Sequence, residues 1–212
     1  RSYSQTGLHD MLQLGVYIYV MSLYKVYGPH VGVMYMSEKL NAELPNQGHY
    51  FNTDHPLSRF TPAGPDHAQI AATNGVIDYF EAVYQHHIGG AASPLEQSRA
   101  VKRLMRDQET KLLQPLLDFM DQHPRIRLIG RRNASDRAPT VSFAVQGWNT
   151  FELASRLSDQ FQLGLGAGDF YAVRLLEAMG INPEDGALRA SFVHYTSEDE
   201  VNRLIKALDE LA

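Results

Sequence analysis

The stretch SLYKVYGPHVG, residues 22–32, places one lysine between two short apolar runs. The first run, residues 16–21, ends shortly before Lys25, and the second, residues 33–36, follows a Gly-Pro turn. Both runs are rich in β-branched and aromatic residues, so we expect two adjacent buried strands with Lys25 at the end of the first. Burial disfavours the charged form of a lysine and makes its amine more nucleophilic. The alternative is a lysine that caps a strand at the surface.

Composition excludes several classes of function. The chain has 212 residues, of which 44% are hydrophobic and 20% charged, as in a globular protein with one large domain or two small ones. Its formal net charge is -5. In its densest basic stretch, residues 125–132, arginines alternate with apolar residues, as in a strand with one exposed edge. We therefore expect no nucleic-acid partner. No apolar run is long enough to span a membrane and no targeting pattern is present, so we expect a cytoplasmic protein.

The chain contains no cysteine, so these residues offer no disulfide, no thiolate metal ligand and no cysteine nucleophile. Nine histidines are present, among them the adjacent pair His86 and His87. Adjacent residues on a helix point in different directions, and the histidines lack the i, i+4 spacing with a carboxylate that zinc helices use. We predict no metal site; a metal hydrolase built on the histidines is the weaker alternative.

Patterns of hydrophobicity divide the chain into three parts. After the apolar runs, residues 41–65 are polar and contain four prolines, which is typical of a lid, a binding loop or a crossing between domains. Helices are predicted at residues 67–85 and 94–122, and the second is long enough to link two domains. Strands and helices then alternate, with strands predicted at residues 126–129, 140–145, 163–165 and 188–193 and helices at 150–161, 169–179 and 197–211.

Two motifs resemble those of the class V aminotransferase and cysteine desulfurase-like family, whose members are fold-type I enzymes that depend on pyridoxal 5'-phosphate (PLP). The first is SxxKxxGP at residues 22–29, and the second is the string LRASFVHYTSEDEV at residues 188–201. The loop FTPAGP, residues 60–65, resembles the glycine-bearing loop that in relatives reaches toward the cofactor phosphate of a partner subunit. The resemblance therefore implies a homodimer.

The resemblance also implies an α/β fold, the C-terminal part of the PLP-dependent transferase (aspartate aminotransferase-like) fold. Residues 1–93 would be the C-terminal part of the PLP-binding large domain, 94–122 the long linking helix and 123–212 the small C-terminal α/β domain. Family members are much longer, and the part without a counterpart here is N-terminal; it includes the acid that pairs with the pyridine nitrogen. We therefore expect a fragment of a longer enzyme, inactive as an isolated chain.

The same resemblance assigns roles to particular residues. Lys25 would form a Schiff base with the cofactor and then move protons at the substrate Cα. Ser22, Tyr24 and Gly64 would also contact the cofactor, with Ser22 hydrogen-bonded to the phosphate. Arg189 would hold the substrate carboxylate, a task suited to a planar, permanently charged guanidinium. A strand-edge arginine that faces water is the alternative for Arg189.

The implied function is a PLP-dependent enzyme that acts on an amino acid or amine, of the aminotransferase, epimerase or lyase type. True cysteine desulfurases need a cysteine in the loop before the last strand, and residues 164–172 contain none, so a persulfide on this chain is excluded. The usual threonine is missing beside Gly64, and Pro65 cannot donate a hydrogen bond to a phosphate. The alternative is a non-catalytic α/β interaction or dimerisation module that keeps the fold.

Overall fold

The computed structural model describes residues 11–61 and 64–212, which fall into two compact units, one within Thr6–Val101 and one within Lys102–Ala212. We call them the N-terminal and the C-terminal unit. Helix α5 (Pro94–Gln122) begins in the first and ends in the second. In the part of the chain that the structure describes, no helix combines the length and the apolarity needed to cross a membrane.

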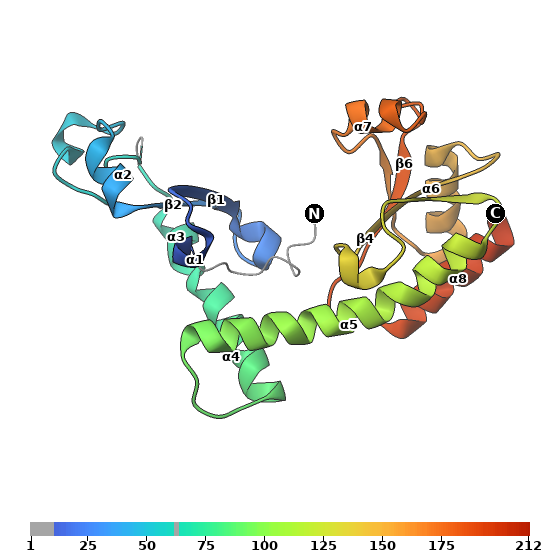
Figure 1. Ribbon diagram of the computed structural model, residues 1–212, viewed down its shortest axis with the longest axis horizontal. Coiled ribbons are helices and arrows are strands. Elements are labelled where there is room, and N and C mark those ends of the chain that lie inside the picture. The colour runs from blue at the N-terminus through green and yellow to red at the C-terminus, as the bar shows by residue number, and fades with distance from the viewer. Residues whose placement is uncertain (1–10, 62–63) are drawn as a thin grey trace. The chain divides into compact units, whose positions relative to one another are not determined.

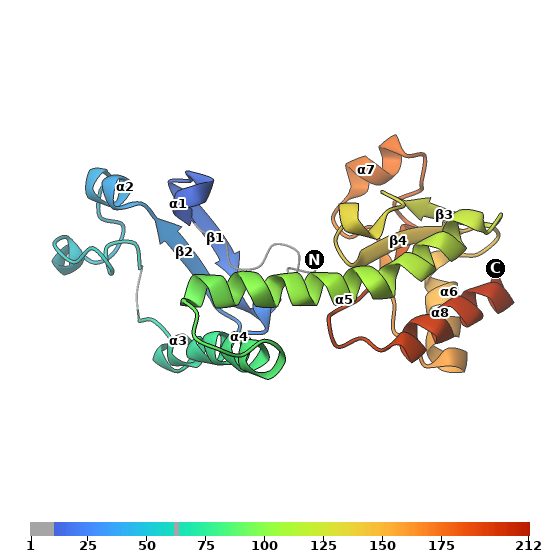
Figure 2. The same ribbon diagram turned by 60° about the horizontal axis from the view of Figure 1, so that its bottom comes forward.

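The N-terminal unit contains an antiparallel hairpin of β1 (Ile18–Ser22) and β2 (Gly32–Met36), drawn side by side in Figure 2. Ser22 pairs with Gly32, and residues 23–31 connect the two strands. The connection begins with the 3₁₀ helix η1 (Leu23–Val26). The other elements of this unit are α1 (Met11–Leu14), α2 (Glu38–Glu43), η2 (Tyr50–Asn52), α3 (His67–Ala72) and α4 (Asn74–His87).

Two sequence predictions for this unit were wrong in detail. The hairpin strands are not buried: every residue of β1 and β2 is exposed or partly exposed, because a two-stranded ribbon has little apolar surface of its own to bury. The helix predicted at residues 67–85 is divided into α3 and α4 at Thr73. The Thr73 hydroxyl donates to the Ile70 carbonyl oxygen at 2.6 Å, and such local bonds compete with the helical ladder.

The buried core of the N-terminal unit joins η1 to α4. Helix α4 buries Val76, Phe80 and Tyr84, which follow each other at a spacing of four and share one helix face. The connection after η1 packs directly on this face. Gly28 approaches Val76 so closely that an added Cβ would lie 2.7 Å from Val76 Cγ2. Helix α4 therefore supports the turn that carries Lys25.

The C-terminal unit is a four-stranded antiparallel sheet in the order β3-β4-β6-β5. Figure 2 shows the sheet between α7 on one side and α6 and α8 on the other. Val141, Phe143 and Val145 alternate along β4 and form one core with residues of α5, α6 and α8. The elements are β3 (Ile126–Ile129), η3 (Ala134–Asp136), β4 (Thr140–Val145), α6 (Thr150–Phe161), β5 (Gly166–Gly168), α7 (Val173–Ala178), β6 (Ala187–Ser191) and α8 (Glu198–Leu211).

Most predicted elements of this unit are confirmed. Helices 94–122 and 150–161 and strands 126–129 and 140–145 have the predicted bounds. The strand predicted at residues 163–165 instead lies at Gly166–Gly168, where it pairs with β6. The two sheets and their helices confirm the predicted α/β fold class, as Figure 1 shows for the C-terminal unit.

Candidate active site

Lys25 lies in η1, one turn beyond the end of the hairpin strand. The strand ends at Ser22, and the Lys25 side chain is partly exposed rather than buried, which corrects the sequence prediction. The reason is the 3₁₀ geometry, which eclipses residues three apart: Leu23 and Val26 are buried, and Tyr24 and Lys25 between them turn outward. Lys25 is therefore partly in contact with solvent.

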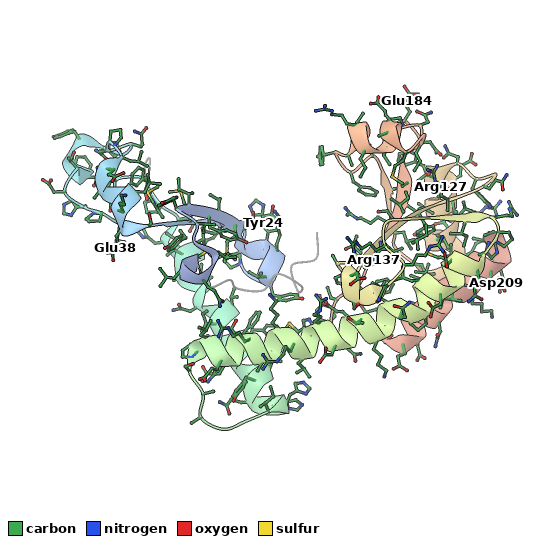
Figure 3. The ribbon with its side chains drawn as sticks, viewed as in Figure 1. Tyr24, Glu38, Arg127, Arg137, Glu184 and Asp209 are labelled. Atoms are coloured by element: carbon green, nitrogen blue, oxygen red, sulfur yellow. The ribbon has the colours of Figure 1, made fainter. Side chains whose placement is uncertain are left out.

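Ser22, Tyr24 and Lys25 form one cluster on this turn, which Figure 3 locates by the label on Tyr24. The pKa of the Tyr24 phenol is lowered, first by a hydrogen bond from the Ser22 hydroxyl and then by the positive charge of Lys25. Lys25 Nζ lies 5.3 Å from the centroid of the Tyr24 ring. The structure thus brings together three of the predicted site residues, two hydroxyls and one amine.

His30 also belongs to this cluster, although the sequence analysis assigned it no role. Its ring stacks on Tyr24, with centroids 4.8 Å apart and planes 14° apart. The stack orients the Tyr24 ring. The signal was available in the stretch at residues 22–32, since the Gly-Pro turn at residues 28–29 brings the chain back toward η1 just before His30.

We expect the substitution Ser22→Ala to raise the pKa of Tyr24, because it removes the hydrogen bond that contributes most to the lowering. Lys25→Met should also raise the pKa of Tyr24, because it removes both a positive charge and a hydrogen bond that lower this pKa. The measurement is an NMR titration of tyrosines labelled at Cζ, with the Tyr24 signal assigned by its loss in Tyr24→Phe. An unchanged Tyr24 titration in Ser22→Ala would contradict the geometry of the cluster.

Gly64 is not placed against the Lys25 cluster. Pro62 and Ala63, which belong to the predicted cofactor loop, lie outside the described residues. Gly64 itself is exposed, and a Cβ added there would meet no atom within 4 Å. A side chain at position 64 would therefore point into open space.

Arg189 belongs to the C-terminal unit, in the middle of β6. Its neighbours Leu188 and Ala190 are buried in the core, so Arg189 points to the opposite face of the sheet. On that face it pairs with Ser142 of β4 and Gly166 of β5. Arg189 is thus an inner-strand residue, because β6 lies between β4 and β5.

The Arg189 guanidinium rests on the ring of Phe170, with its central carbon 4.2 Å from the ring centroid. Its Nε is buried and has no hydrogen-bond partner among the residues that the structure describes. Sequence reasoning missed Phe170. Phe170 lies two residues after Gly168, and no local pattern there predicts its contact with Arg189.

Other candidate sites carry less chemistry. Over residues 11–61 and 64–212, no group of three or more histidine or acidic side chains could hold a metal ion. A cavity of about 350 Å³ lies between α4 and the start of α5, lined by residues such as Ile77, Phe80 and Leu95. None of the predicted site residues lines this cavity.

Comparison with known proteins identifies the family. The family model for class V aminotransferases matches residues 4–204. An aminotransferase-like protein of Gibberella zeae is 29% identical over 202 residues, which cover 94% of this chain and 47% of that protein. The chain therefore belongs to the class V aminotransferase family.

Solved structures share the fold. A cysteine desulfurase from Thermococcus onnurineus NA1 superposes with a TM-score of 0.75 at 22% identity, over 95% of this chain and 48% of that one. A variant of the enzyme C-DES, solved with glycine covalently linked to its PLP cofactor, superposes with a TM-score of 0.64 at 18% identity, over 96% of this chain and 48% of that one. The chain thus spans about half the length of the relatives it matches, and its fold is that of the PLP-dependent transferases.

Proposed function

We propose that this chain is the C-terminal part of a PLP-dependent enzyme that acts on an amino acid or amine, and that Lys25 carries the cofactor. PLP is the cofactor of the family. The observation that supports the role of Lys25 is the cluster of its amine with the Ser22 and Tyr24 hydroxyls on one turn. An amine fits the cofactor aldehyde, and hydroxyls that can rotate fit its phosphate oxygens as donors.

The proposed domain boundaries are those predicted from the sequence. Residues 1–93 complete the PLP-binding large domain, residues 94–122 link the domains, and residues 123–212 form the small domain. Gly64 is proposed as a further cofactor contact. A homodimer and a cytoplasmic location belong to the same proposal, because family membership is their support.

The chemistry assigned to the residues of this chain is proton transfer and substrate binding. The bound cofactor would supply an electron sink for negative charge at the substrate Cα. Lys25, a partly exposed residue of η1, would remove and return the proton at that carbon. Tyr24, stacked on the His30 ring, would stay oriented beside the amine. Arg189 would donate hydrogen bonds to the substrate carboxylate.

The type of reaction is narrowed by the absence of a thiol. No residue of the chain is a cysteine, so no side chain here could accept sulfur from a substrate as a persulfide. We therefore propose an aminotransferase, epimerase or lyase type of reaction. The relatives named above support the PLP-dependent class, and the reaction type rests on the composition of this chain.

The test of this proposal is borohydride reduction of the intact protein with added PLP, followed by peptide mapping. We expect a new visible absorbance on addition of PLP and, after reduction, a phosphopyridoxyl label on the peptide that contains Lys25. A label on another lysine would overturn the assignment. The absence of both absorbance and label, with an unchanged thermal midpoint, would support the non-catalytic module instead.

A further inference from the structure

The face of the C-terminal sheet that points away from the core holds one cationic side chain in an aromatic contact. Arg189 lies on this face, and Phe170 approaches it from the loop that follows β5. A Cβ added at Gly166 would lie 3.2 Å from Phe170 Cε1 and 3.7 Å from Arg189 Nη2. The bare backbone of Gly166 therefore leaves the room in which the ring and the guanidinium meet.

The loop holds Phe170 against Arg189 in a strained conformation. Phe170 and Tyr171 have φ angles of 51° and 59°, in the left-handed region that residues other than glycine rarely adopt. The Asp169 side chain accepts a hydrogen bond from Tyr171 N at 2.9 Å, and the Asp169 carbonyl oxygen accepts one from Ala172 N at 2.8 Å. The two aromatic rings separate: Phe170 is partly buried on Arg189, and Tyr171 is 103% exposed.

The guanidinium keeps its hydrogen-bond donors free. Within residues 11–61 and 64–212 the Arg189 side chain makes no hydrogen bond or ion pair, and its buried Nε is unsatisfied. A buried donor without a partner carries a desolvation cost that a ligand can remove. The aromatic face orients the planar cation through its π electrons and leaves the N–H groups at the edge of the plane. Such an edge matches the two oxygens of a carboxylate.

We propose that Phe170 is a positioning residue that holds the Arg189 guanidinium ready for a carboxylate. The inference rests on the proposed function of Arg189 and extends it to the residue that orients the guanidinium. Phe170 acts through Arg189 and makes no contact with the reacting carbon in this proposal. Its aromatic ring, rather than its bulk, is the required feature.

The test compares three variants of the intact protein: Phe170→Leu, Phe170→Tyr and Tyr171→Leu. The first observable is the NMR shift of Arg189 Hε, assigned by its loss in Arg189→Lys. We expect the Phe170 ring to shift this proton upfield in the parent protein and in Phe170→Tyr, and the shift to disappear in Phe170→Leu. Tyr171→Leu is the matched control, because it removes an aromatic ring from the same turn without touching Arg189.

The second observable is the binding of a simple carboxylate. Sodium propionate is titrated into the protein, and its binding is monitored by the change in the Arg189 Hε signal. We expect Phe170→Leu to weaken this binding about tenfold, the size of a partly desolvated cation–π contact, and to raise KM for an amino acid similarly. The kcat should change by less than about twofold, because Arg189 would hold the carboxylate equally in the bound substrate and in the transition state. Phe170→Tyr and Tyr171→Leu should match the parent protein.

The outcomes separate this inference from the function on which it rests. If propionate moves the Arg189 resonance equally in the parent protein and in Phe170→Leu, the carboxylate site stands and the positioning role of Phe170 is overturned. If propionate leaves the resonance unmoved in the parent protein, the carboxylate role of Arg189 fails, and this inference fails with it. Equal losses in Phe170→Leu and Tyr171→Leu would show a general effect of the turn and would also overturn the positioning role.

Discussion

Replacing Lys25 with alanine should lower kcat/KM for an amino-acid substrate about 10²–10⁴-fold, because the substitution removes the proposed proton-transfer group. The same variant should lose the covalent label after PLP addition and borohydride reduction. The loss should not come from unfolding, since Lys25 is partly exposed and the buried residues of η1, Leu23 and Val26, are unchanged. Steady-state kinetics and mass spectrometry of the labelled peptide provide the two measurements.

Two further variants make this result specific. Lys25→Arg keeps the positive charge near Tyr24 but removes the nucleophilic amine, so it should lose the label and the activity as Lys25→Ala does. Lys39→Ala is the matched control, because Lys39 is an exposed lysine of α2 in the same unit. It should behave as the parent protein. Retention of label and activity in Lys25→Ala would show that another lysine carries the cofactor.

The second large effect is expected for Gly186→Ala, which should destabilise the C-terminal unit. Gly186 has a φ of +73°, and a Cβ there would lie 2.3 Å from the backbone carbon and oxygen of Gly168. Both are backbone atoms, so the loop carrying Phe170 must move away from β6. We expect a loss of about 1–2 kcal/mol from the left-handed backbone and a further loss of about 1–3 kcal/mol from the forced separation.

The measurement is denaturant unfolding followed by the fluorescence of Trp148, the single tryptophan of the chain. Trp148 reports on the C-terminal unit because its ring packs on the core and its Nε1 donates to the Leu211 carbonyl oxygen at 2.8 Å. Gly180→Ala is the control, since Gly180 has a similar φ of +67° but no atom within 4 Å of the added Cβ. Equal losses of unfolding free energy in the two variants would show that the close contact between position 186 and Gly168 does not contribute to the destabilisation.

The elements that sequence patterns predicted best are long or regularly alternating. Helix α5 kept its predicted bounds over 29 residues because a period near 3.6 repeats over eight turns. Strand β4 kept them because its buried and partly exposed residues alternate without interruption. The short elements were less predictable: the three residues of β5 form a strand only where they pair with β6, and no local pattern marks that pairing.

The candidate site shows the same division. Ser22, Tyr24 and Lys25 were assigned from the resemblance of the motif at residues 22–29 to the family motif, and the structure places them on one turn. The exposure of Lys25 could not be predicted, because no local pattern showed that the strand would end at Ser22 and that the chain after η1 would pack at Gly28 against Val76 of α4. Phe170 could not be recognised either, since its contact with Arg189 requires the loop after β5 to fold back over the sheet.

The sequence by itself determined the family motifs, the chemistry available to them and the absence of a thiol. These properties depend on residue identity and on spacing within single elements, which local geometry preserves. Only the tertiary structure decided that the Lys25 amine turns outward and that an aromatic ring covers the Arg189 guanidinium. Those features arise where separate segments pack together, and the free energy of such packing depends on shapes and distances that no local pattern encodes.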